Sequence, residues 1–201
     1  MKKLLKPFSY IFHPLFMPML GVGIYFIITK KYIPEPFLYA KLFALSILTI
    51  IVPILFFFLL RNLGLIDSAF IPRVKQRRLP LLSNIALTFL VIKVVVNGYE
   101  FPELYYFFLG ILITTIILFL LSLLKVRASL HMVGLSGVIA FVMGLSIHYA
   151  DNLLYLLAVL IFFLGCTASS RLVYKAHTIL ELLLGLVIGI LPQVAIFYYW
   201  L

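Results

Sequence analysis

The chain has 201 residues, of which 65% are hydrophobic and only 11% are charged, so it is far too apolar for a soluble domain or a disordered chain. Its single cysteine, Cys166, excludes a disulfide scaffold. The formal net charge is +10, but most of the cations stand in short segments between apolar runs. In such places they face a membrane surface or an anionic ligand, so nucleic acid is not an expected partner.

The apolar runs predict an all-α fold, a polytopic transmembrane helix bundle with about six to seven spans. A helix needs about 20 residues to cross the hydrocarbon core of a bilayer. Short connections join the runs and no internal repeat is visible, so we expect a single integral membrane domain over residues 1–201. Pro14 and Pro18 would kink the first run, which leaves a re-entrant segment as its alternative. The seven runs lie at roughly 8–29, 38–60, 80–97, 103–124, 131–149, 152–169 and 178–200.

The basic residues predict the orientation. With seven spans, the segments between helices alternate between two sides, and 12 Lys and Arg fall on the side of the N-terminus. Lys30, Lys31 and Lys41 belong to the other side. The positive-inside rule then places the N-terminal side in the cytoplasm.

The segment before the last run holds the strongest candidate site. His177 and Glu181 are four residues apart, so on a helix they would share one face. The carboxylate could then fix the tautomer of the imidazole and leave its other nitrogen free as a nucleophile or base. Arg171 adds a planar guanidinium suited to phosphate oxygens.

Two further polar segments fall on the same side of the membrane, because an even number of spans separates each from the next. Ser129 and His131 stand just before the fifth run. Lys75, Arg77 and Arg78 stand before the third run, within a dense basic stretch. Cations that face two histidines and an arginine would hold a doubly charged phosphoryl group.

These segments resemble the three signatures of type 2 phosphatidic acid phosphatases. The spacing Ser170-Arg171-x5-His177-x3-Glu181 resembles the third signature, Ser-Arg-x5-His-x3-Asp, with Glu in place of Asp. The sequence Ala-Ser-Leu-His at 128–131 resembles the second, Pro-Ser-Gly-His. The basic run that ends at Pro80 resembles the first, Lys-x6-Arg-Pro, although Leu79 separates Arg78 from the proline. The resemblance covers about residues 73–181.

The resemblance implies a membrane-embedded lipid phosphatase that needs no metal and no other cofactor. His177, oriented by Glu181, would attack phosphorus to give a phosphohistidine, and His131 would protonate the leaving group. Arg171, Arg78, Arg77, Lys75 and Ser129 would bind the phosphate. The apolar walls favour a lipid partner: a phosphatidate, a phosphatidylglycerol phosphate, a polyprenyl pyrophosphate or a lipid A-type phosphate. The expected location is the bacterial inner membrane, and the sequence indicates no protein partner.

Three alternatives share the same residues. A phosphotransferase would pass the phosphoryl group to an alcohol instead of water. In a zinc hydrolase, His13, His131 and His177 would be ligands and Glu181 the base. A non-enzymatic anion transporter or lipid-binding protein would use the cations without chemistry. Relatives of the phosphatase kind usually work on the outer face, whereas the charge count places this site on the cytoplasmic face.

Overall fold

The computed structural model describes residues 2–67 and 73–201, and in this part of the chain the helices are joined by turns and loops, without strands. Six of its helices are long and apolar enough to cross a membrane, which confirms the predicted polytopic helix bundle and makes the chain an integral membrane protein. Some spans consist of several consecutive helical elements, including 3-10 and π-helical segments. The six candidate spans are Glu35–Asn62, Val74–Val95, Pro102–Leu123, Leu130–His148, Leu154–Val173 and Ile179–Tyr199.

The first apolar run is interrupted, so a continuous helix over 8–29 is not observed and the run is not among the six candidate spans. Helix α1 (Lys2–Ile11) ends before His13, a 3-10 turn η1 covers Pro14–Phe16, and α2 follows at Met17–Ile28. His13 is extended, with φ −65° and ψ 136°, because the ring of the following proline disfavours a helical conformation at the preceding residue. The 12 residues of α2 give about 18 Å of helix. The segment nevertheless runs beside α7 (Leu130–His148) from its start, where His13 meets His131, to its end, where Thr29 Oγ1 lies 3.2 Å from the Tyr149 hydroxyl.

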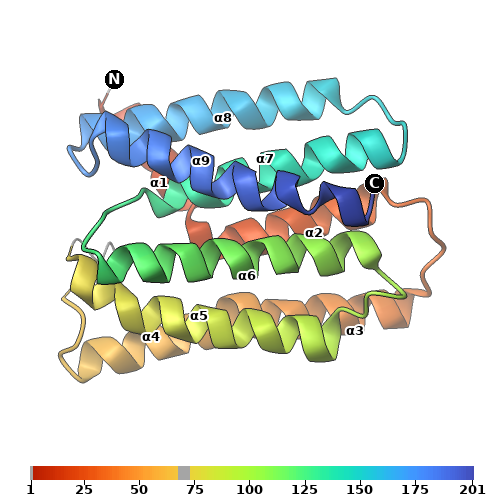
Figure 1. Ribbon diagram of the computed structural model, residues 1–201, viewed down its shortest axis with the longest axis horizontal. Coiled ribbons are helices and arrows are strands. Elements are labelled where there is room, and N and C mark those ends of the chain that lie inside the picture. Colours follow the sequence, from red (N-terminus) through yellow and green to blue (C-terminus); the bar gives the residue numbers. More distant parts are fainter. Residues whose placement is uncertain (1, 68–72) are drawn as a thin grey trace. The chain divides into compact units, whose positions relative to one another are not determined.

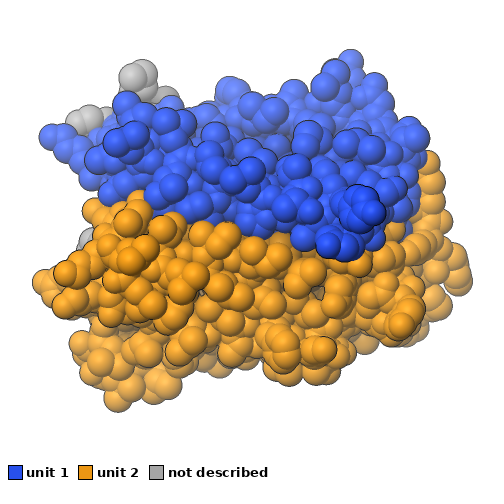
Figure 2. Space-filling model, in the orientation of Figure 1, with its two compact units in different colours: residues 1–29, 128–201 blue, residues 30–127 orange. Residues whose placement is uncertain are grey.

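Contacts divide the chain into two compact units, which Figure 2 shows in different colours. Unit 1 comprises residues 1–29 and 128–201, and unit 2 comprises residues 30–127. Unit 1 contains α1, η1 and α2, followed by α7 (Leu130–His148), α8 (Leu154–Val173), α9 (Ile179–Ala195) and η5 (Phe197–Tyr199). A single membrane domain over the whole chain stays a prediction.

Unit 2 is built from α3 (Glu35–Ser46), α4 (Val52–Asn62), α5 (Arg78–Leu90) and α6 (Pro102–Leu123). The π-helical segment η2 (Ile47–Ile51) joins α3 to α4 just before Pro53, whose missing N–H interrupts the regular hydrogen-bond ladder. A 3-10 turn, η3 (Val74–Arg77), leads into α5, and a second π-helical segment, η4 (Val91–Val95), ends that span.

Helix α7 is the most buried of the six candidate spans and contacts α2, α8 and α9. Its contact with α9 is very close, because Gly185 and Gly189 lie on the facing side of α9. A Cβ at position 185 would come within 2.7 Å of the Ser129 carbonyl oxygen, and one at 189 would collide with Ser136 Oγ. Ser136 Oγ in turn donates to the Leu186 carbonyl at 3.1 Å. Small residues four apart permit such close packing in membranes, and here they fix the register of the two helices.

The start of α7, the end of α8 and the start of α9 lie at one end of unit 1 (Figure 1). The backbone N–H of Ser129 donates to the Glu181 carbonyl at 3.0 Å, so the first turns of α7 and α9 are joined directly. The polar residues of the second and third sequence segments therefore meet at this end of unit 1.

Candidate functional site

His177 and Glu181 form the shortest side-chain contact of the site. His177 Nδ1 lies 2.7 Å from Glu181 Oε2, and the two side chains are 4% and 18% exposed. A carboxylate accepts, so Nδ1–H donates to it and Nε2 keeps the lone pair of the neutral ring. The carboxylate therefore fixes the tautomer and the orientation of the His177 ring.

The pair meets in a different way from the one the sequence predicts. His177 precedes α9 and is not on the helix, because Thr178 is its N-cap residue. Thr178 and Glu181 form a capping box: Glu181 N–H donates to Thr178 Oγ1, and Thr178 N–H donates to Glu181 Oε2, each at 3.3 Å. Glu181 Oε2 thus caps the helix and orients His177 at the same time.

A buried hydroxyl and a buried imidazole begin α7. Ser129 is the N-cap residue, yet its side chain makes no capping bond. Among the residues that the structure describes, the fully buried Ser129 Oγ has no hydrogen-bond partner. The first N–H groups of a helix have no acceptors within that helix and favour an anion. The start of α7 thus offers a hydroxyl beside a helix N-terminus.

His131, two residues further on, is held by the N-terminal segment. Its Nε2 lies 3.0 Å from the carbonyl oxygen of Ser9, an atom that can only accept, so Nε2 carries a proton. The nitrogen of His131 that remains to exchange a proton with a ligand is therefore Nδ1. The sequence analysis does not predict this role of Ser9. Every residue has a backbone carbonyl, so the residue type does not show which one accepts a hydrogen bond.

Arg171 ends α8 and is buried. The chain leaves the helix through a turn in which Ala176 N–H donates to the Arg171 carbonyl at 2.9 Å and Lys175 has a left-handed φ of 51°. This helix-ending turn accounts for the short interval between the arginine and His177. Arg171 and His177 both lie close enough to His131 for their charges to interact.

His13 is also part of this cluster. Its ring lies edge-on to that of His131, with centroids 5.4 Å apart and planes at 84°. Burial and, to a smaller extent, the charge of Arg171 lower the pKa of His13, which lies outside the six candidate spans. The sequence suggests His13 only as a zinc ligand.

The zinc alternative gains no geometric support. In the ranges 2–67 and 73–201, the structure groups no three His, Cys, Asp or Glu side chains that could hold a metal ion. His13 and His131 are neighbours, but Ser9 takes one nitrogen of His131 and Glu181 takes one of His177.

The three candidate cations of the first segment belong to unit 2. Lys75 is exposed and Arg77 is buried, both in η3, while Arg78 begins α5. Arg78 Nη2 donates to the Ser122 carbonyl at 3.2 Å, so part of its guanidinium caps the end of α6. Residues 68–72, which precede these cations in the same loop, lie outside the described residues.

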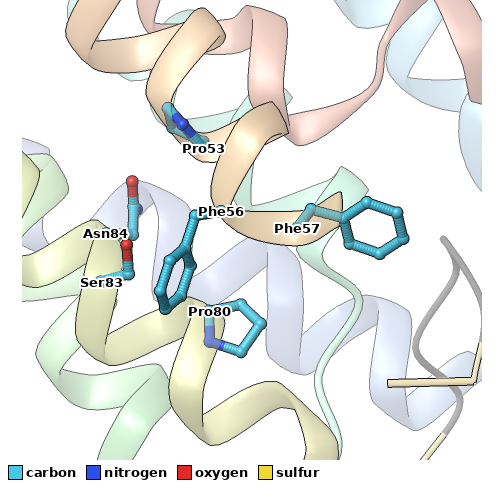
Figure 3. Close-up of a pocket in the computed structure, with 6 residues that line it drawn as sticks. All are labelled: Pro53, Phe56, Phe57, Pro80, Ser83 and Asn84. Atoms are coloured by element: carbon cyan, nitrogen blue, oxygen red, sulfur yellow. The ribbon is translucent and has the colours of Figure 1, made fainter. Parts of the chain in front are cut away.

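Unit 2 also contains a small cavity between α4 and α5 (Figure 3). Its volume is about 50 Å³, which is room for a few water molecules and far too little for a lipid headgroup. None of the predicted site residues lines it. The lining residues are Pro53, Phe56, Phe57, Pro80, Ser83 and Asn84.

No protein-family model, curated protein or solved structure matches this chain. A function must therefore be inferred from the side chains that meet at the end of unit 1.

Proposed function

We propose that this protein is a metal-independent lipid phosphatase that resembles type 2 phosphatidic acid phosphatases. The observation that carries the proposal is the 2.7 Å bond between His177 Nδ1 and Glu181 Oε2, beside a buried Arg171 and His131. A carboxylate that orients an imidazole through Nδ1 is the arrangement that a nucleophilic histidine needs. A guanidinium and a helix N-terminus nearby suit the charge of a phosphoryl group.

In the proposed reaction, His177 Nε2 attacks phosphorus and the bond from phosphorus to the leaving oxygen breaks. His131 enters this step as the imidazolium, with both nitrogens protonated. Nε2–H stays bonded to the Ser9 carbonyl, and the Nδ1 proton goes to the leaving oxygen, which returns the ring to its neutral form. Glu181 stabilises the positive charge on the phosphohistidine ring. A water molecule then attacks phosphorus, His131 takes its proton, and inorganic phosphate leaves with His177 restored.

Phosphoryl transfer depends mainly on positioning and on stabilising charge that spreads over the equatorial oxygens. In unit 1, the charge on these oxygens would be stabilised by Arg171, the Ser129 hydroxyl and the first N–H groups of α7. Arg77, Arg78 and Lys75 stay predicted phosphate-binding residues. They lie in unit 2, where Arg78 also caps the end of α6. The proposed substrate is a lipid that carries a phosphate monoester or pyrophosphate, since the site belongs to a chain of membrane-spanning helices.

We place the protein in the inner membrane of a bacterium, with the site at the cytoplasmic face. The basic residues at the N-terminal side support this orientation. On the other side, Lys41 and Lys31 are paired with acidic residues, at 3.1 Å from Glu100 and 3.6 Å from Glu103.

The test is phosphate release by the detergent-purified chain from a panel of lipid phosphates, in the presence of EDTA. Wild type should release phosphate and His177→Ala should not, while His148→Ala serves as the matched control. His148 is an exposed histidine in the last turn of α7. Release that the His177 variant retains would overturn the proposal, and so would no release from any lipid. Adding an alcohol acceptor distinguishes transfer from hydrolysis.

A further inference from the structure

Ser9, in the N-terminal helix α1, makes two hydrogen bonds to residues of the candidate site. The Ser9 carbonyl accepts from His131 Nε2 at 3.0 Å, and Ser9 Oγ lies 2.8 Å from Ser170 Oγ, both hydroxyls being buried. Ser170 directly precedes Arg171 in the chain. The segment before η1 is thus bonded both to His131 and to the residue beside the buried arginine.

A glycine in α7 permits this close approach. A Cβ at Gly134 would lie 2.7 Å from Met17 Cγ and 3.5 Å from Pro14 Cα, so a larger residue would have to displace the Met17 side chain at the start of α2. As a result, the His13 ring lies edge-on to His131, with centroids 5.4 Å apart. Arg171 is near enough to act on the charge of His13.

The hydrogen bonds of His13 define its tautomer. Leu15 N–H donates to His13 Nδ1 at 3.3 Å, so Nδ1 carries no proton. A neutral imidazole has one N–H, which must then be on Nε2. Burial also favours the neutral ring, because it lowers the pKa of His13. His13 therefore offers one hydrogen-bond donor, Nε2–H, without adding a second full charge beside Arg171.

We propose that His13 is a further phosphate-binding residue, whose Nε2–H donates to an oxygen of the phosphoryl group held by Arg171 beside His131. This inference rests on the proposed function, because it assumes that the site binds a phosphate. The recognised chemistry is a phosphate oxygen, carried either by a lipid headgroup or by free inorganic phosphate. A neutral donor next to a cation satisfies such an oxygen at a lower desolvation cost than a second buried cation would.

Two substitutions separate this role from the structural role of His13. In His13→Asn, the side-chain oxygen can still accept from Leu15 N–H, as Asn favours such a cap, but the donor at the Nε2 position is lost. In His13→Gln, the amide group reaches farther and can place an N–H near that position. His13→Met is matched to Gln in length and has no donor.

The experiment measures binding of inorganic phosphate to the detergent-purified full chain by calorimetry, with thermal unfolding of each variant alongside. We expect His13→Asn to bind phosphate about tenfold more weakly than wild type, since a hydrogen bond to a charged group is lost. Its unfolding midpoint should stay at the wild-type value. His13→Gln should bind about tenfold more tightly than His13→Met. The Michaelis constant for a lipid phosphate should rise in parallel in the Asn variant, which separates the lipid-borne phosphate from free phosphate.

The outcomes are distinct from those of the phosphatase test. Wild-type phosphate binding in His13→Asn would overturn this inference, even where His177→Ala abolishes phosphate release and the proposed function stands. Weaker binding in His13→Asn would support it, even where no lipid is hydrolysed and the proposed function fails. If His13→Asn does not fold, the comparison of His13→Gln with His13→Met tests the inference instead. Equal phosphate affinities of these two variants would overturn it. Absence of phosphate binding by wild type would overturn this inference, whereas the proposed function is decided by the release assay.

Discussion

The backbone N–H of Ser129 donates to the carbonyl of Glu181 at 3.0 Å, and this bond joins the two polar segments that the sequence singles out. Glu181 also contacts His177 through its side chain. Glu181 thus orients His177, the proposed nucleophile, and holds the start of α7 next to it. A change at Glu181 can therefore act on the proposed reaction through its charge and on folding through its cap.

Glu181→Gln separates the two roles of this residue. Glutamine can also complete a capping box, so the stability of α9 should change by less than about 1 kcal/mol. It carries no charge to stabilise the His177 imidazolium, so turnover should fall by about a hundredfold or more. Phosphate release at saturating substrate and thermal unfolding measure the two effects.

Thr178→Ala is the control for the Glu181 variant, because it removes the cap and leaves the carboxylate. It should cost about 1 kcal/mol of stability and keep most of the activity. Unchanged turnover in Glu181→Gln would mean that the carboxylate only caps the helix.

Ser129→Ala should weaken phosphate binding without destabilising the protein. Within the described residues the Ser129 hydroxyl is buried with no hydrogen-bond partner, so its removal relieves a desolvation cost of about 1 kcal/mol. Ser136→Ala is the matched control on the same helix, because its hydroxyl donates to the Leu186 carbonyl and its loss should destabilise by about 1 kcal/mol. A lower unfolding midpoint for Ser129→Ala, with unchanged phosphate affinity, would contradict a ligand role for this hydroxyl.

Chelators should leave phosphate release unchanged. The reaction proposed for His177 uses no metal, and the described residues form no group of three metal-ligating side chains. Incubation with EDTA and then with a zinc-selective chelator, followed by the same phosphate assay, measures this directly. Activity that is lost on chelation and returns with added Zn²⁺ would instead favour the zinc alternative.

Long apolar runs predict the spans well, because the length of a membrane helix is set by the bilayer and hydropathy reports it. The break at Pro14 is also visible in sequence, but whether a proline kinks or ends a helix depends on what supports the freed backbone groups. Here His13 caps the following turn, and α2 then continues beside α7 until Thr29 meets Tyr149. Pro18, by contrast, lies at the start of α2, where its missing N–H costs little.

The spacing of His177 and Glu181 correctly predicts that their side chains meet. The geometry by which they meet differs from the one that the spacing suggests. A four-residue interval suggests two residues on one helix, whereas the structure places His177 before the helix and uses a capping box. The carbonyl of Ser9 and the division into two units leave no comparable signal, because both depend on contacts between segments far apart in the chain.

Gly189→Ala should destabilise unit 1 and reduce activity, although the substitution lies two turns from Glu181. The added Cβ would collide with Ser136 Oγ and the Val133 carbonyl, so α7 and α9 would have to separate. Such overpacking costs about 1–3 kcal/mol, and the separation would also strain the bond between Ser129 and Glu181. Gly165→Ala on α8 is the matched control, because a Cβ there meets nothing within 4 Å and should be neutral or stabilise by about 0.5–1 kcal/mol. Thermal unfolding and phosphate release of both variants measure the difference, and equal behaviour of the two would show that the close contact between α7 and α9 does not hold the site together.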